Sequence, residues 1–189
     1  VKMVRLMEAN PDTALIQGIA RPLKTLLWIG LALLAVQIAL GGWTSANYAA
    51  LACGTDFPTC NGQWLPAHDF REALVLWRGI GVDYEGGVLD GPARVAIQLM
   101  HRGMAVIVAL YLLGIALKLI RTPGLVYWGS LLLLLVLAQV ALGISNVVYS
   151  LPLWVAVAHN AGAALLLFVV VGLLARLREP EQSPEPVQD

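Results

Sequence analysis

The longest uncharged segment of the chain is TPGLVYWGSLLLLLVLAQVALGISNVVYSLPLWVAVAHNAGAALLLFVVVGLLA, which covers residues 122–175. A helix rises about 1.5 Å per residue and the hydrocarbon core of a bilayer is about 30 Å thick, so one span needs about 20 apolar residues. A segment of 54 residues is too long for one span. Because proline is accepted in the first turn of a helix, we expect the chain to turn at Tyr149-Ser150-Leu151-Pro152 and to begin a second span there.

Two shorter uncharged segments, residues 25–55 and 103–117, predict two further spans. The sequence therefore predicts an all-α fold, an integral membrane four-helix bundle. Its spans are expected at about residues 23–46, 95–118, 124–148 and 152–175, with a loop at residues 47–94 between the first two.

The composition agrees with a membrane protein. Of the 189 residues, 59% are hydrophobic and 13% are charged, whereas a soluble domain has about 45–50% apolar and about 25% charged residues. The 12 basic and 12 acidic residues cancel, so no excess of positive charge is present to attract nucleic acid. This composition also excludes a disordered chain, a disulfide-dense secreted scaffold and a collagen-like fibre.

Residues 22–178 form the predicted membrane domain. Residues 1–21 are expected to be a cytoplasmic or interfacial connector, because they are too long and too mixed in polarity for a cleaved signal peptide. The tail at residues 179–189 is rich in Pro and Glu, and this composition predicts disorder.

Basic residues gather on one side of the predicted bundle. The positive-inside rule places this side, and with it both chain termini, in the cytoplasm. The 47–94 loop is then expected on the outer, periplasmic side of the cell inner (plasma) membrane. The basic residues of the cytoplasmic side are Lys2, Arg5, Arg21, Lys24, Lys118, Arg121, Arg176 and Arg178.

The predicted outer loop contains the two cysteines of the chain, Cys53 and Cys60. An oxidising exterior favours a disulfide bond between them, and the alternatives are two free thiols or a metal pair. In the same loop, Asp69 and Glu72 form the pattern of a capping box. We therefore expect a short amphipathic helix at about residues 69–79, lying on the membrane surface.

The two predicted hairpins repeat each other in sequence. QIALG at residues 37–41 of the first span returns as QVALG at residues 139–143 of the third, and HRGMA at 101–105 resembles HNAGA at 159–163 in the fourth. The bundle is therefore predicted to be built from two pseudo-repeated helical hairpins, related by a twofold axis along the membrane normal.

The repeat places His101 and His159 at matched depth. Each lies six or seven residues into its predicted span, so both imidazoles are expected about 9–10 Å below the outer surface. Two imidazoles are too few ligands for zinc or copper, but they match the two axial positions of a haem iron. We predict that His101 and His159 are the metal ligands of a haem; interhelical hydrogen bonding and a proton relay are the alternatives.

Small and polar residues surround the predicted histidine layer. Small side chains let helices approach closely, or let a flat ligand lie against the backbone; they are Gly41, Gly42, Gly103, Ala105, Gly143, Ala158, Ala161 and Gly162. The polar candidates for hydrogen bonds to the histidines or between helices are Gln37, Gln98, Gln139 and Asn160.

Arg102 is the only charged residue well inside a predicted span. Its side chain is expected either to bind a haem propionate or to extend to the outer surface. Arg78 and Arg94 are further candidates for the propionate. All twelve carboxylates lie outside the predicted spans, so the membrane layer has no carboxylate to act as general acid or base. These features favour a haem-binding electron carrier over a self-sufficient catalyst.

Several motifs, in their order along the chain, resemble the haem A synthase family, in particular its C-terminal half. The resemblance covers about residues 22–178. The motifs are LGGWTSANYAALAC at 40–53, DFPTCNGQW at 56–64, YEGGV at 84–88, HR at 101–102, LGISN at 142–146 and AVAHN at 156–160.

The resemblance implies a fold and an activity. Members of this family have eight transmembrane helices in two similar halves, and they oxidise the C8 methyl group of haem O to the formyl group of haem A. By resemblance, His101 and His159 would bind haem b (iron-protoporphyrin IX), and Cys53 and Cys60 would form the disulfide of the outer loop. The haem O substrate would bind in the other half.

The chain departs from the family in length, because the substrate half is missing. That half carries a glutamate three residues before its first histidine, where this chain has Gln98. We therefore expect a fragment, one part of a split enzyme, or a half that pairs with itself. No motif identifies the electron donor.

The resulting prediction is an oxidoreductase of the haem A synthase family, embedded in the lipid bilayer, with catalysis completed by a partner or missing half. The alternative is a membrane cytochrome b, an electron-transfer subunit without a biosynthetic role. A third possibility is an assembly or scaffold protein whose histidines form hydrogen bonds with neighbouring helices.

Overall fold

The computed structural model describes residues 11–76 and 88–177, and within them it contains helices but no strand. Four helices are long and apolar enough to cross a membrane, which confirms the predicted all-α membrane bundle. The expected tail at 179–189 and the first part of the 1–21 connector lie outside the described residues. The helices are α1 (Pro11–Ala46), α2 (Phe70–Ala73), α3 (Gly91–Ile120), α4 (Val126–Val148) and α5 (Leu153–Arg176).

The helix ends follow local signals in the sequence. The turn between α4 and α5 lies at residues 149–152, as the proline predicts. By contrast, α3 begins four residues before its predicted span, because the Asp90 side chain accepts a hydrogen bond from the Ala93 N–H at 2.9 Å. Helix α1 begins at Pro11, so part of the expected connector is helical.

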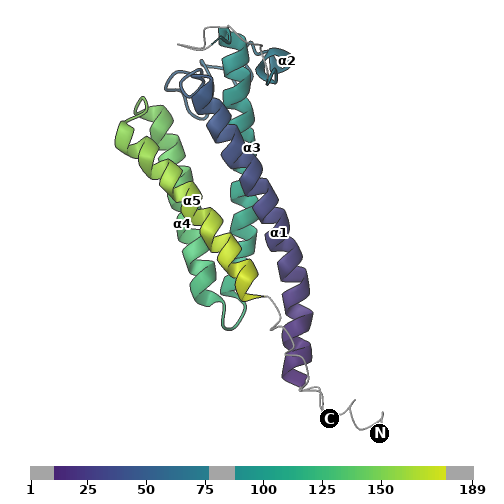
Figure 1. The fold of residues 1–189 in the computed structure, drawn as a ribbon. Helices are drawn as coiled ribbons and strands as arrows, with labels where there is room; N and C mark the ends of the chain where they lie inside the picture. The colour runs from purple at the N-terminus through teal and green to yellow at the C-terminus, as the bar shows by residue number, and fades with distance from the viewer. Residues whose placement is uncertain (1–10, 77–87, 178–189) are drawn as a thin grey trace, which may run out of the picture.

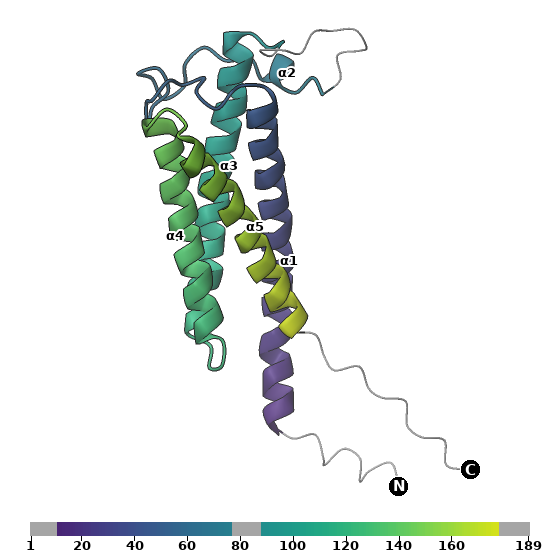
Figure 2. The ribbon, with the colours of Figure 1, turned by 60° about the vertical axis from the view of Figure 1, so that its left-hand side comes forward.

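The four long helices form a bundle in which each helix has two neighbours (Figures 1 and 2). Helix α3 packs against α1 and α4, and α5 packs against α4 and α1. Helices α3 and α5 therefore lie on one diagonal of the bundle, and within the described residues none of their Cα atoms come within 8 Å of each other. This arrangement matters because the two candidate ligands are on α3 and α5.

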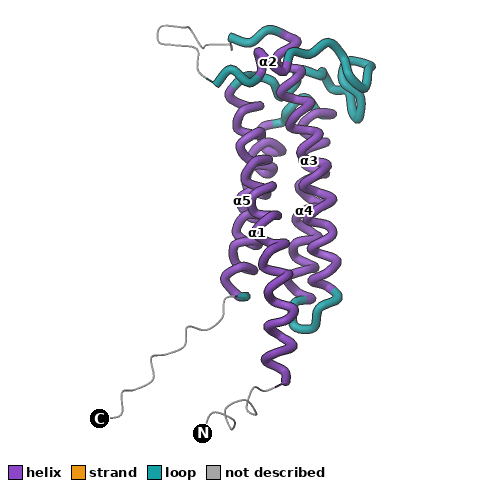
Figure 3. The backbone as a smooth tube through the Cα atoms, turned by 90° about the vertical axis from the view of Figure 1, so that its right-hand side faces the viewer, coloured by secondary structure: helices purple, strands orange, loops and turns teal. Residues whose placement is uncertain are grey.

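The connection between α1 and α3 covers one end of the bundle, which we call the loop end (Figure 3). The main buried core lies away from this end. Its largest fully buried members are Leu23, Leu27, Leu112, Leu119, Leu132 and Leu173, contributed by all four long helices. Because lipid is as apolar as leucine, such a core stabilises a membrane bundle through van der Waals contact rather than through exclusion of water.

At the loop end, the connection packs on α3 through smaller clusters. One of them joins Ala49 and Ala73 to Ala93, Ala96 and Ile97. The indole N–H of Trp43 also donates to the Ala73 carbonyl oxygen at 3.0 Å, which ties the end of α1 to α2.

The predicted surface helix is shorter than expected. Asp69 caps it as predicted, accepting a hydrogen bond from the Glu72 N–H at 2.9 Å. Helix α2 nevertheless ends at Ala73, with Leu74 as its C-cap. A single turn cannot present a long apolar face. Trp77 and Gly79, which the expected helix included, lie outside the described residues.

Gly129 allows α4 to lie directly on the backbone of α3. A Cβ at this position would lie 2.6 Å from the Ile120 amide nitrogen and 2.8 Å from the Ala116 carbonyl oxygen. We expect Gly129→Ala to push the helices apart and to lower the free energy of unfolding by about 1–3 kcal/mol, measured by thermal unfolding in detergent. Gly114→Ala is the matched control, since a Cβ there meets no atom within 4 Å. Equal unfolding temperatures for the two variants would contradict this packing.

Candidate haem site

His101 of α3 packs against one turn of α1. The Gln37 side-chain Nε2 lies 3.2 Å from His101 Nδ1, and it donates to the His101 carbonyl oxygen at 3.3 Å. One turn further along α1, Gly41 makes room for the ring, because a Cβ there would lie 3.3 Å from His101 Cε1. Residues four apart share a helix face, so Gln37 and Gly41 contact the same histidine.

His159 of α5 is contacted by α4 in the same way. The Gln139 Nε2 donates to the His159 carbonyl oxygen at 2.8 Å. A Cβ at Gly143 would lie 3.1 Å from His159 Cε1. Gly162 adds a feature that the first hairpin lacks, since a Cβ there would overlap the amide oxygen of Gln139. The repeated QxALG sequence is thus a pair of equivalent histidine contacts, which we call the Gln-Gly seats: Gln37 with Gly41, and Gln139 with Gly143.

The two seats lie at equivalent positions in their helices. Gly41 is five residues before Ala46, where α1 ends, and Gly143 is five residues before Val148, where α4 ends. Both histidines are half-buried. Among the hydrogen bonds of the described residues, none involves Nε2 of His101 or of His159. Each ring therefore keeps its Nε2 available for a ligand.

Several buried polar atoms near the seats have no hydrogen-bond partner. They are Gln37 Oε1, Gln139 Oε1, Asn146 Oδ1 and His159 Nδ1. A buried polar atom without a partner costs about 1–3 kcal/mol, and such atoms are rare in native proteins. The other two such side-chain atoms among the described residues are Gln98 Oε1 and Arg102 Nε, on the same helix as His101. This grouping fits a site that binds a ligand.

The apolar core does not extend into this layer. Its fully buried members nearest the seats along each helix are Leu34, Val108, Val136 and Leu166. Beyond them, toward the loop end, the seats bring glycines, glutamines and histidines between the helices. The buried apolar residues of α4 and α5 in this part, Val147 and Val155, belong to none of the apolar clusters. Among the described residues, no three His, Cys, Asp or Glu side chains gather as a metal-binding group. Two imidazoles, with glycines beside their rings, match the needs of a haem, which brings its own four nitrogen ligands.

Arg102 has a contact that the sequence did not predict. Its two terminal nitrogens donate to the backbone carbonyl oxygens of Thr59 and Asp56, at 2.9 and 3.1 Å. The guanidinium carbon also lies 6.0 Å from the centre of the Phe57 ring. Arg102 thus anchors the loop to α3 directly beside His101. The predicted propionate contact of Arg102 stays a prediction.

Cys53 and Cys60 form the disulfide bond that the outer loop predicts, with their Cα atoms 4.5 Å apart. Both residues are almost fully buried and pack against Val95 of α3. The free-thiol and metal-pair alternatives are therefore wrong in this structure. The Arg102 contacts and the disulfide fix the same loop.

A thiol-labelling experiment tests the disulfide in the protein itself. We expect Cys53 and Cys60 to resist alkylation in the folded and in the denatured chain, and to react fully after reduction. Mass spectrometry of the labelled chain measures this. Labelling of the denatured, unreduced chain would contradict the bond.

The remaining polar candidates do not reach the histidines. Gln98 is buried, and its Nε2 donates to the Ala50 carbonyl oxygen at 3.1 Å, which links α3 to the loop. Asn160 is exposed on α5. Of the four predicted polar residues, only Gln37 and Gln139 contact the histidine residues.

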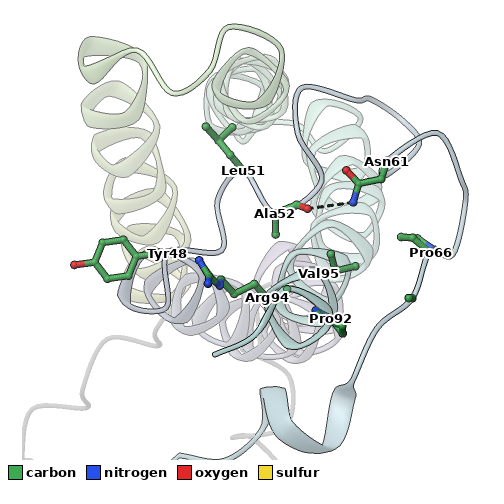
Figure 4. Close-up of a pocket in the computed structure, with 10 residues that line it drawn as sticks. Tyr48, Leu51, Ala52, Asn61, Pro66, Pro92, Arg94 and Val95 are labelled. Carbon is green, nitrogen blue, oxygen red and sulfur yellow. Dashed lines mark hydrogen bonds between the residues drawn. The ribbon is translucent and has the colours of Figure 1, made fainter. Parts of the chain in front are cut away.

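Arg94 lies at the loop end, where it lines a cavity of about 430 Å³. Figure 4 shows Arg94 and Tyr48 on one side of this cavity and Asn61 and Pro66 on the other. The Arg94 Nε donates to the Leu89 carbonyl oxygen at 2.9 Å. Neither histidine lines the cavity. Arg78, the other arginine considered for a propionate, lies outside the described residues.

Four membrane-length helices with two equivalent histidine seats define an integral membrane protein built from two similar helical hairpins. Comparison with known sequences then gives its family. The chain belongs to the COX15-CtaA family of cytochrome oxidase assembly proteins, whose family model matches residues 2–171. With four such helices, it is a multi-pass plasma membrane protein.

Curated relatives carry the name Heme A synthase. The chain is 47% identical over 149 residues to that of Shewanella oneidensis, covering 79% of this chain and 45% of the relative. It is 34% identical over 150 residues to that of Paracoccus denitrificans, and the match covers 78% of this chain and 36% of the relative. With that of Rhizorhabdus wittichii it shares 32% identity over 182 residues, covering 95% and 47%. The chain thus spans less than half the length of each relative. No solved structure matches the chain.

Proposed function

We propose that this chain serves haem A biosynthesis as the haem b-binding half of a haem A synthase. The relatives named Heme A synthase support the biosynthetic role. The duplicated Gln-Gly seat is the observation that carries the haem-binding role. It leaves the histidine Nε2 without a hydrogen bond in both His101 and His159, which lie on two diagonal helices.

The residues of this chain have separate roles in the proposal. His101 and His159 would hold the haem iron through their Nε2 atoms, and Gly41 and Gly143 leave space beside their rings. The apolar core seals the end of the bundle away from the loop. When bound, haem b supplies reversible one-electron chemistry to the reaction. Arg102, beside His101, is the proposed propionate partner through its remaining buried Nε–H.

The proposal places the loop end on the periplasmic side and both termini in the cytoplasm, following the distribution of basic residues. The haem O substrate then binds in a partner chain or in a half that this sequence lacks. If haem b is bound, an electron donor would be needed to reduce it, and we expect that partner or half to supply the groups that oxidise the substrate.

Gln98 favours a second candidate function, that of a plain membrane cytochrome b. A carboxylate at this position can act as a base, whereas an amide cannot. The Gln98 amide is used instead to hold the Ala50 carbonyl oxygen. A chain of this kind would transfer electrons without any biosynthetic role.

Pigment analysis of membranes that contain haem O distinguishes these functions. We expect the chain alone to bind haem b and to form no haem A, measured by pyridine haemochrome spectra and by chromatography of the extracted haems. Full-length Heme A synthase of Shewanella oneidensis is the positive control.

Co-expression with the N-terminal half of that relative tests the biosynthetic role, and we expect haem A to appear. Haem A formed by the chain alone would overturn the assignment as a half. No haem A with the added half, while haem b is bound, would favour the cytochrome b alternative.

A further inference from the structure

The two glutamines of the Gln-Gly seats use only part of their hydrogen-bonding capacity. Each Nε2 is engaged with its histidine residue, at 3.3 Å for the His101 carbonyl oxygen and at 2.8 Å for that of His159. Each Oε1 is buried without a partner. The same incomplete arrangement therefore occurs in both hairpins, on two different pairs of helices.

Joining the helices does not explain this arrangement. The bond from Nε2 to the histidine carbonyl oxygen already links α1 to α3 and α4 to α5. A leucine of similar size would pack between helices and leave no buried oxygen without a partner. Gln98 Oε1 is also buried without a partner, but of these three glutamines only Gln37 and Gln139 contact a histidine residue. Their amide oxygens are therefore the ones that a ligating histidine can use as acceptors.

The chemistry of a ligating histidine identifies the donor of that second bond. A neutral imidazole has one N–H and one acceptor nitrogen. When Nε2 binds a metal, Nδ1 carries the hydrogen and needs an acceptor. His101 Nδ1 lies 3.2 Å from the Gln37 amide nitrogen. His159 Nδ1 is buried and unpartnered, in the residue whose carbonyl oxygen the Gln139 amide already holds. An amide oxygen accepts such a bond, whereas an amide N–H cannot.

We propose, on the basis of the haem ligation argued above, that Gln37 and Gln139 are positioning residues for the two axial histidines. With iron bound, Gln37 Oε1 accepts the Nδ1–H of His101, and Gln139 Oε1 accepts the Nδ1–H of His159. At His159 the Gln139 Nε2 holds the backbone carbonyl oxygen, and Gln139 Oε1, which lies beside Gly162, turns toward the ring. At His101 the Gln37 amide group rotates, so that Gln37 Oε1 takes the place beside His101 Nδ1 that Gln37 Nε2 occupies in this structure.

Such a bond has two effects on the haem. It fixes the rotation of the imidazole ring, and it makes the ligating nitrogen a stronger donor. A stronger donor stabilises ferric relative to ferrous iron, so the glutamines lower the reduction potential. Both effects are visible in spectroscopy of the bound haem, without any assay of activity.

Redox titration of the purified haem-loaded chain tests the proposal. In Gln37→Leu and in Gln139→Leu we expect the ratio of ferric to ferrous haem, measured at the midpoint potential of the wild type, to fall about tenfold. This change equals a rise of about 59 mV in the midpoint potential of a one-electron couple. Gln37→Glu should shift the ratio in the opposite direction, because a carboxylate is a stronger acceptor. Gln98→Leu is the matched control, since this buried amide contacts the loop and neither histidine, and it should titrate like the wild type.

The outcomes separate this proposal from the haem ligation on which it rests. If the wild type binds a low-spin haem, and both leucine variants titrate with the wild-type midpoint, the glutamines are structural and the proposal is wrong, while the ligation stands. If the wild type binds no haem, both fail. If the leucine variants do not accumulate, Gln37→Glu decides, and an unchanged midpoint in that variant overturns the proposal.

Discussion

Replacing either His101 or His159 with alanine is expected to abolish the low-spin haem spectrum of the purified chain. Both histidines would hold one haem iron, and their side chains come from helices on opposite corners of the bundle, so neither could replace the other. Another described histidine, His68, lies in the loop, with its Nδ1 2.7 Å from the Pro66 carbonyl oxygen. It cannot take the place of a lost ligand within the bundle.

Absorption spectra of the oxidised and reduced protein measure this effect through the Soret and α bands. His68→Ala is the matched control and should keep the wild-type bands. A low-spin spectrum that persists unchanged in both His101→Ala and His159→Ala would exclude these residues as the ligands.

Replacing Gly41 or Gly143 with valine is expected to lower the affinity for haem about 10- to 100-fold. Substitution of a residue that orients a metal ligand has an effect of this size. At Gly41 and Gly143 the first carbon of a new side chain would lie 3.3 and 3.1 Å from the Cε1 atom of the histidine ring. Valine adds two methyl groups beyond that carbon, and its rotation is restricted in a helix. The imidazole must then move away from its seat.

Gly42→Val provides a sharp control for Gly41→Val. The two glycines are adjacent in α1, but a Cβ at Gly42 meets no atom within 4 Å. Both variants cost the same helix propensity, so only the contact with His101 differs. Haem titration of the purified apoprotein compares their affinities. Equal affinities would mean that the glycine does not position the histidine.

The spans could be predicted from sequence because their signal is simple. The gaps between charged residues reflect the cost of a charge in lipid, and Pro152 marked the turn between α4 and α5. The start of α3 was predicted four residues late, at residue 95, whereas the helix begins at Gly91, next to the Asp90 cap. A capping residue followed by proline was the local signal for that start.

The histidine seats could be predicted only in part. The repeat indicated that Gln37 and Gln139 are equivalent, and spacing by four placed Gly41 and Gly143 on the same faces. The repeat did not show which helices are neighbours. The contacts between the glutamine amides and the histidine residues could therefore be found only from the folded structure.

The Arg102 contacts were not predictable from sequence. Its partners are backbone carbonyl oxygens more than forty residues away. Every residue has a carbonyl group, so the sequence does not indicate which of them accepts a hydrogen bond. The loop conformation, which the Cys53–Cys60 bond restricts, brings these oxygens to the arginine.

Electron paramagnetic resonance of the oxidised, purified chain, combined with quantitation of haem per polypeptide, tests the central claim most directly. Ligation of one iron by His101 and His159 of the same chain predicts one haem per polypeptide and a low-spin ferric signal typical of two imidazoles. A high-spin signal, an absence of haem, or one haem shared by two chains would contradict it.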